Sequence, residues 1–540
     1  MNNPNFTSLV PKYEFSETLE EQQRELRDNP LLLRMLAARK NMESDPYRPI
    51  FHYVNPENRL NDPNGLCYWK GRWHLFYQAY PPDDPRQHWG HAVSEDLIHW
   101  QDLPYAIYPN PEECCFSGAI LVEEHRVIAM YHGTQVGNMI AVSSDPLLLN
   151  WEKLTGAPVI PIPEQNNTPQ RYTVFDPCIW SKDGVYYALS GGTLTTEPGG
   201  NRTAADFLFR SKDLLEWEYL HPFTEADNFT LVGDDGACPY FWPIGDRHIL
   251  LFFSHMSGGQ YLLGDYSSKR HKFVVTKGGL FNFGASTPSG VHAPSATPDG
   301  HGGVIVIFNM NPGMETTGWN QIMTLPRTLT LAAKDDLRIK PAGDVESLRY
   351  APSHIGNTML PANEEVVLGS LEGNAMEIIA EIDPKSSPMV ELNVLRSPRK
   401  EEFTRIAFFK DRGFRYRDWD DKSGALLASG NTVVPRYGTP RDLQARESLL
   451  TIDTSYSSTL PGALSRAPET TPIRLAPEEH LELRIFIDRS VVEVFANGKA
   501  CVAVRVYPGR VDSVGVSLRA QGDDAELVAL SAWQMKNIYE

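Results

Sequence analysis

Three acidic elements of the chain stand just before apolar runs. They are Asn61-Asp62-Pro63-Asn64-Gly65, Asp176 within Val174–Trp180, and Asp234-Asp235 within Gly233–Tyr240. Each alone is typical of a turn, because Asn, Asp, Pro and Gly are the commonest turn residues. Together they indicate a group of carboxylates. Glycoside hydrolysis uses such a group: one carboxylate attacks or stabilises the anomeric carbon, and another acid protonates the leaving oxygen.

The acids can act together only if the fold brings them to one place, and a repeat of short buried strands predicts how it does so. Five such runs recur at intervals of 54, 59, 63 and 56 residues, at 73–77, 127–131, 186–189, 249–253 and 304–308. A period of 50 to 65 residues with about four strands per unit is typical of a β-propeller, and here it predicts five blades. A generic β-sandwich is the alternative. A propeller gathers the starts of its inner strands around one funnel, where the acids would meet.

A second recurring motif supports the repeat. Three of the runs are followed by a Ser-x-Asp turn and then a Trp, at Ser94-Glu95-Asp96 before Trp100, Ser143-Ser144-Asp145 before Trp151, and Ser211-Lys212-Asp213 before Trp217. Recurrence of the same turn at the same place in successive units is what stacked blades require.

The rest of the chain predicts four parts. Residues 1–45 form a helical appendage, with a helical pattern over 17–41 that Pro30 interrupts. Residues 46–345 form the propeller, and the turn-rich segment 346–365 is a linker. Alternating strands such as 376–380 and 481–487 predict a β-sandwich over 366–540. The fold class is therefore all-β, a five-bladed propeller followed by a sandwich.

Composition excludes several kinds of partner. The chain has 540 residues and a formal net charge of −18 at pH 7, so we expect neither nucleic acid nor a membrane as a partner. We find no secretory signal and no uninterrupted apolar run near the roughly 18 residues that span a bilayer, so we expect a cytoplasmic protein. The six cysteines form no CxxC pair, and the histidines between 74 and 99 fit strands and turns better than a zinc site. We expect no metal and no cofactor, and the sequence indicates no oligomeric state.

Several motifs, in this order along the chain, resemble those of one family. They are the 61–65 run, Trp89-Gly90-His91 with a following Asp-Leu-x-x-Trp, Phe116-Ser117-Gly118, Asp176-Pro177, Leu325-Pro326-Arg327 and the tail segment 488–495. From about residue 46 to the end the chain resembles glycoside hydrolase family 32, the invertases, inulinases and levanases. The resemblance implies a five-bladed propeller joined to a β-sandwich, and retaining hydrolysis or transfer of β-fructofuranosyl groups without a cofactor.

The resemblance also implies roles for individual residues. Asp62 aligns with the nucleophile that forms a covalent fructosyl-enzyme, and Asp176 with the carboxylate that holds sugar hydroxyls and stabilises the transition state. The fructose pocket would be lined by Asn61, Gln78, Trp89, Phe116 and Ser117. These types suit a sugar, because amides and hydroxyls satisfy its hydroxyl groups and rings stack on its apolar face.

The chain departs from the family pattern at two places. The family's acid/base is the Glu of a Glu-Cys-Pro motif, where this chain has Ala237, and the Arg that precedes the second Asp is replaced by Phe175. Alanine cannot donate a proton. Strand alternation puts Asp235 on the same side as Ala237, which makes it a candidate substitute acid. His255 is a weaker candidate, for which a structural hydrogen-bonding role is the alternative.

Three functions follow, in order of preference. The first is a retaining β-fructofuranosidase acting on sucrose, fructo-oligosaccharides or fructans, with Ala237 either natural or engineered. The second is a catalytically weak or inactive fructan-binding protein. The third, an arabinan- or xylan-active relative with the same propeller, is disfavoured by the 61–65 run and the sandwich tail. In each case the expected ligand is a small or oligomeric sugar.

Overall fold

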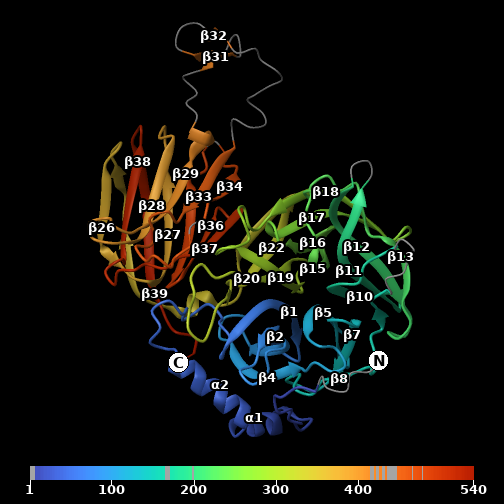
Figure 1. The fold of residues 1–540 in the computed structure, drawn as a ribbon. Coiled ribbons are helices and arrows are strands. Elements are labelled where there is room, and N and C mark those ends of the chain that lie inside the picture. Colours follow the sequence, from blue (N-terminus) through green and yellow to red (C-terminus); the bar gives the residue numbers. More distant parts are fainter. Residues whose placement is uncertain are drawn as a thin grey trace. The chain divides into compact units, whose positions relative to one another are not determined.

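The computed structural model describes residues 7–163, 171–196, 200–413, 447–464, 466–476 and 478–539, and between 414 and 446 it describes three short strands. The chain divides into two compact units, residues 1–347 together with 537–540, and residues 348–536. Strands dominate both units, whereas the α-helices in the described residues lie at the N-terminal end (Figure 1).

Five sheets make up most of the first unit (Figure 1). The first contains β1 (Arg59–Trp69), β2 (Arg72–Tyr80), β3 (His88–Ser94) and β4 (Gln101–Ile107). The second contains β5 (Cys115–Val122), β6 (Val127–Gly133), β7 (Gly137–Ser143), β8 (Glu152–Lys153) and β9 (Ile160–Pro161). The third contains β10 (Pro177–Lys182), β11 (Val185–Thr196), β12 (Asn201–Ser211) and β13 (Glu218–Pro222). The fourth contains β14 (Thr224–Glu225), β15 (Ala237–Ile244), β16 (Arg247–Ser254), β17 (Gly258–Ser267) and β18 (Lys272–Leu280). The fifth contains β19 (Val291–Pro298), β20 (Val304–Met310), β21 (Ile322–Met323), β22 (Arg327–Ala333) and β23 (Asp336–Pro341).

The five sheets close into a ring. Strands β1, β5, β10, β15 and β19 each contact the next in this order, and β19 contacts β1. The predicted buried runs fall on β2, β6, β11, β16 and β20, which pair with those inner strands. The five-bladed propeller is therefore confirmed, and the starts of its inner strands surround one axis.

The Ser-x-Asp motif forms the same turn in three of the blades. It follows β3, β7 and β12, and in each case the Ser hydroxyl donates to the Asp carboxylate two residues later, at distances of 3.0, 2.8 and 3.1 Å. Each carboxylate also accepts backbone N–H groups of the next residues, which fixes the turn.

The N-terminal segment forms two helices, α1 (Leu19–Arg27) and α2 (Pro30–Asn41). Thr18 caps α1, and Asn29 caps α2 by accepting the backbone N–H of Leu32. Pro30 stands in the first turn of α2, where its missing N–H costs nothing. Pro30 therefore begins a second helix.

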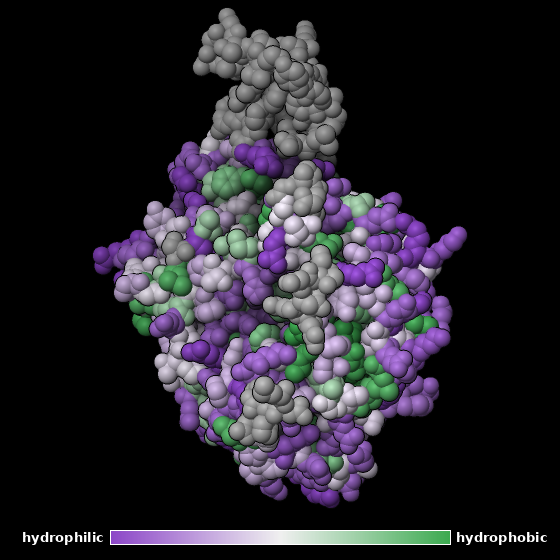
Figure 2. All heavy atoms as spheres, turned by 45° about the vertical axis from the view of Figure 1, so that its right-hand side comes forward, coloured by the Kyte–Doolittle hydropathy of each residue, from purple (hydrophilic) through white to green (hydrophobic). Residues whose placement is uncertain are grey.

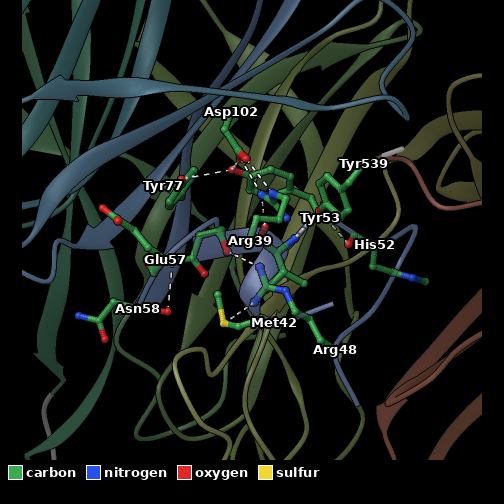
Figure 3. A network of polar contacts seen from close by, with 12 residues as sticks. Arg39, Met42, Arg48, His52, Tyr53, Glu57, Asn58, Tyr77, Asp102 and Tyr539 are labelled. Atoms are coloured by element: carbon green, nitrogen blue, oxygen red, sulfur yellow. Dashed lines mark hydrogen bonds and ion pairs between the residues drawn. The ribbon is translucent and has the colours of Figure 1, made fainter. Parts of the chain in front are cut away.

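A buried polar network fixes α2 to the first blade (Figure 3). Arg39 donates from Nε and Nη2 to Asp102, at 2.8 and 2.7 Å, and from Nη2 to the carbonyl of Val54. The Tyr53 hydroxyl lies 3.0 Å from the same carboxylate. The ring of Tyr539 covers the Arg39 guanidinium at 3.8 Å, so the chain's last residues complete this site in the first unit.

Two sheets form the second unit, and their buried aliphatic side chains make one core. One sheet contains β24 (Arg349–Ile355), β25 (Thr358–Leu360), β27 (Ala375–Asp383), β35 (Leu481–Asp488), β36 (Val491–Ala496), β37 (Ala500–Arg505) and β39 (Ala525–Met535). The other contains β26 (Glu365–Glu372), β28 (Met389–Arg396), β29 (Thr404–Phe409), β33 (Ser448–Asp453), β34 (Glu469–Ile473) and β38 (Gly515–Gln521). This is the predicted sandwich, and β24 and β25 of its first sheet lie within the segment that we expected to be a linker. A single 3₁₀ turn stands at Val345–Leu348, and the turn at Lys410–Gly413 has left-handed backbone at Asp411 and Arg412. Strand β31 (Ala425–Ala428) pairs with both β30 (Trp419–Asp420) and β32 (Thr432–Val433).

The surface in view in Figure 2 is mainly hydrophilic, with hydrophobic side chains scattered over it. In the described part of the chain no helix is long and apolar enough to cross a membrane.

Candidate active site

Asp62 lies in β1 and is buried, with 6% of its surface exposed. Its Oδ2 accepts the hydroxyl of Ser117 at 2.8 Å and the side-chain amide of Gln78 at 3.3 Å. Its Oδ1 is buried and has no hydrogen-bond partner in the structure. The carboxylate is thus oriented through one oxygen, while the other is unsatisfied and available to a ligand.

Asp176 stands directly before β10 and shares a neighbour with Asp62. The thiol of Cys238 lies 3.5 Å from Asp176 Oδ2 and 3.6 Å from Asp62 Oδ2, and the Cys238 backbone N–H donates to Asp176 at 3.1 Å. Three blades therefore bring their inner-strand starts together at one sulfur. Burial, and next the negative charge of Asp62, raise the pKa of Asp176 to about 7.

Cys238 was not among the residues that we predicted for the site. It is buried and stands in the left-handed region, with φ of 49°. Burial, followed by the charges of Asp176 and Asp62, raises the pKa of its thiol, so the sulfur keeps its proton as a donor to both acids. Its place beside Ala237 was the only signal in the sequence.

The predicted polar residues form a connected network around Asp62. Gln78 donates to Ser117 at 2.7 Å and accepts from the amide of Asn61 at 3.0 Å. The Asn61 carbonyl in turn accepts from Gln321, at 2.9 Å. Gln321 stands directly before β21 in the fifth blade and was missed, because nothing in its local sequence distinguishes it from a loop residue.

The predicted aromatic residues contribute in two ways. Trp89 is fully buried, and its indole N–H donates to the carbonyl of Phe116 at 2.9 Å, so it supports the segment that carries Phe116 and Ser117. Direct contact of Trp89 with a sugar stays a prediction. Gly90 follows it because a Cβ there would lie 2.3 Å from the ring of Tyr77. The Phe116 ring is partly exposed and lies 6.2 Å from that of His132, which contacts Phe175 at 5.0 Å.

Ala237 begins β15 and is 1% exposed. It belongs to a small apolar cluster with Cys238, Phe253 and Ala293, and it pairs with Phe253 across to β16. The register shifts between Ala237 and Tyr240, which is a bulge. The position where the family has its acid therefore offers only a methyl group here.

Asp235 and His255 form an ion pair next to this cluster. Asp235 Oδ2 lies 2.5 Å from His255 Nδ1, and its Oδ1 accepts the His255 backbone N–H at 3.2 Å. The side chain of His255 is 58% exposed and that of Asp235 35%. Hydrogen bonding to Asp235 raises the pKa of His255, burial lowers it, and the charges of Asp62 and Asp176 also raise it. Both oxygens of Asp235 accept hydrogen bonds from His255 in the structure. A role of Asp235 as the acid stays a prediction.

The described residues contain no group of three or more His, Cys, Asp or Glu side chains that could hold a metal ion. Asp62 accepts a hydroxyl and Asp176 a backbone N–H, whereas the half-buried Asp235 binds a histidine.

Comparison with known proteins gives consistent matches. The sequence profile of the Glycosyl hydrolases family 32 N-terminal domain matches residues 52–341, and that of the family's C-terminal domain matches 344–534. Levanase of Bacillus subtilis (strain 168) is 27% identical over 93% of this chain and 72% of its own. Sucrose-6-phosphate hydrolase of Escherichia coli is 27% identical over 93% of this chain and 97% of its own. Among solved structures, fructan 1-exohydrolase IIa of Cichorium intybus has a TM-score of 0.75 at 22% identity, over 91% of this chain and 98% of its own.

Proposed function

Because the chain belongs to glycoside hydrolase family 32, we propose that it hydrolyses β-fructofuranosides through a covalent fructosyl-enzyme. Asp62 is the nucleophile and Asp176 stabilises the transition state. The substrates are sucrose, fructo-oligosaccharides or fructans, the class to which the names of its levanase and fructan exohydrolase relatives refer.

One observation carries the proposal: the thiol of Cys238 contacts both Asp62, near the start of β1, and Asp176, directly before β10. Asp62 is oriented by Ser117 and has one unsatisfied oxygen, which is the arrangement that a nucleophile toward an anomeric carbon needs. In the first step this oxygen forms a bond to the anomeric carbon as the glycosidic bond breaks. In the second step water takes its place and Asp62 leaves as a carboxylate.

Asp176 suits the stabilising role because it is buried beside Asp62. Burial and the charge of Asp62 raise its pKa to about 7. The positive charge that develops on the sugar ring favours the ionised carboxylate, which in turn stabilises that charge. Its backbone and thiol contacts to Cys238 hold it in place during this change.

The test is release of fructose from sucrose, inulin and levan by the wild-type chain, with Asp62→Asn and Ala237→Glu beside it. We expect turnover of at least one substrate by the wild-type chain and none by Asp62→Asn. If the wild-type chain releases no fructose and Ala237→Glu does, the wild-type chain is a disabled fructosidase. If neither chain releases fructose but calorimetry shows that inulin or levan binds, the result favours the fructan-binding alternative.

A further inference from the structure

A proton donor is needed near the scissile bond, and Ala237 cannot supply it. The strand register shows which groups lie next to this position. Ala237 pairs with Phe253, and continuing the antiparallel register by two residues on each strand places Asp235 opposite His255. The ring of His255 packs on that of Phe253, the cross-strand partner of Ala237, with ring centres 4.9 Å apart, and Asp235 binds His255, so both residues lie beside the Ala237 position.

We propose that His255 is the acid/base of this site and that Asp235 is its positioning residue. The inference rests on the proposed function, since it supplies the proton donor which that reaction requires. Asp235 binds the imidazole through Nδ1 and fixes its orientation. Nε2 of His255 makes no hydrogen bond to any described residue and belongs to a side chain that is 58% exposed, so it is open to a substrate.

The turn that carries His255 is anchored at four points. Ser257 donates its hydroxyl to Asp234 at 2.9 Å, and its carbonyl accepts from Asn282 at 2.9 Å. The carbonyl of His255 accepts the hydroxyl of Ser286 at 2.8 Å, and Asp235 holds the backbone N–H of His255. A catalytic group needs such support, because its reacting atom must be held within a fraction of an ångström of its target.

The charges around His255 favour its protonated form. Asp235 contributes most to raising its pKa, and Asp62 and Asp176 add to this effect. His292, whose ring lies 5.9 Å from that of His255, has its pKa lowered by burial, which favours its neutral form. Phe253 packs against both rings, at 4.9 and 4.2 Å. The carboxylates next to His255 thus favour the protonated imidazole, which is the form that a general acid needs.

The balanced reaction has two steps. As Asp62 bonds to the anomeric carbon, the electron pair of the breaking C–O bond goes to the leaving oxygen, which takes the proton of His255 Nε2. In the second step neutral His255 accepts a proton from water, the water oxygen bonds to the anomeric carbon, and Asp62 departs as a carboxylate. His255 ends protonated, as it began, so nothing else is consumed.

The experiment compares two substrates in the wild-type chain and His255→Gln. Sucrose has a poor leaving group that needs protonation, whereas p-nitrophenyl β-D-fructofuranoside does not. We expect His255→Gln to lose about 10²- to 10⁴-fold in kcat/KM on sucrose and little on the aryl substrate. Added azide should form fructosyl azide with this variant, and Ala237→Glu in the same chain should restore part of the sucrose activity.

The matched control is His99→Gln, because His99 pairs with Asp96 at 2.6 Å in a similarly exposed turn. It should leave both substrates unaffected. Equal losses on the two substrates, or unchanged sucrose activity, in His255→Gln would overturn the inference alone. A wild-type chain without activity on the aryl substrate would overturn the proposed function itself.

The role of Asp235 has a separate readout. If Asp235 keeps His255 protonated, Asp235→Asn should move the basic limb of the kcat/KM profile to lower pH, because the pKa of His255 falls when the carboxylate is lost. Asp235→Glu keeps a carboxylate next to His255, so its basic limb should lie close to that of the wild-type chain. An unmoved basic limb in a correctly folded Asp235→Asn variant would rule out the positioning role.

Discussion

Asp176→Asn should make the protein more stable and less active, and its effect on stability should depend on pH. Burial and the charge of Asp62 raise the pKa of Asp176 from its usual 3.8 to about 7. The unfolded chain loses this proton near pH 4, whereas the folded protein keeps it until about pH 7. Between these values the folded state binds more protons, so its stability falls as the pH rises through this window.

The size of the effect follows from the shift. A pKa difference of about 3 units corresponds to about 4 kcal/mol of folding free energy, an upper value for a buried acid of this kind, and the full cost is present above pH 7. Asn carries no charge, and its carbonyl oxygen can still accept the Cys238 backbone N–H. The variant should therefore exceed the wild type in stability at pH 8, and the difference should disappear near pH 4.

The assay is calorimetric Tm at steps from pH 4.5 to pH 8, with fructose release measured on the same samples. Glu216→Gln is the control, because it removes an exposed carboxylate of the same unit. A Tm difference that stays constant across the range, or a variant less stable at pH 8, would refute the electrostatic argument. Activity at pH 7 should fall at least about 100-fold, because a charge-stabilising group is lost.

Two further predictions concern side chains that support the first unit and Asp62. Arg39→Ala should lower the free energy of unfolding of the first unit by about 3 to 5 kcal/mol, seen as a lower Tm, because it leaves the carboxylate of Asp102 buried without its ion-pair partner. The control Arg210→Ala removes the exposed ion pair with Glu218 and should cost less than about 1 kcal/mol. Ser117→Ala should lower kcat/KM on sucrose by about 10- to 100-fold with little change in Tm, since it removes the shortest hydrogen bond to Asp62; an unchanged kcat/KM would show that Ser117 does not orient the acid.

The repeat made the propeller predictable, because its strands depend on local pattern. Buried runs at a constant interval and the Ser-x-Asp turns each mark one place in a blade, and both hold in the structure. The helix boundary at Pro30 follows the same local logic once Asn29 is recognised as a cap. The meeting of Asp62 and Asp176 follows from the same propeller, since Asp62 lies near the start of β1 and Asp176 directly before β10, whereas their catalytic roles stay predictions.

The contacts of Cys238 with Asp62 and Asp176, and of Asp235 with His255, were not predictable, because they depend on how separate strands align in the folded protein. Asp235 and His255 meet only when β15 and β16 are aligned through Ala237 and Phe253. The thiol of Cys238 reaches both acids because its backbone adopts a positive φ after Gly236, which also has one. A bulge of this kind re-aims side chains, and simple strand alternation does not anticipate it.

The two departures from the family pattern belong to one electrostatic change. Compared with the family pattern, Phe175 stands in place of a cation beside Asp176, and Ala237 in place of an acid. Phe175 packs against His132, and burial lowers the pKa of His132 to about 4, so neither ring supplies a charge here near neutral pH. His255 supplies a positive charge that lowers the pKa of Asp176, and Asp235 supplies a negative one. The ion pair of His255 with Asp235 thus replaces both missing charges, with their roles exchanged: the cation donates the proton, and the carboxylate holds the donor. On this proposal proton delivery follows the pKa of His255, and kcat/KM should decline as the pH rises and that histidine loses its proton.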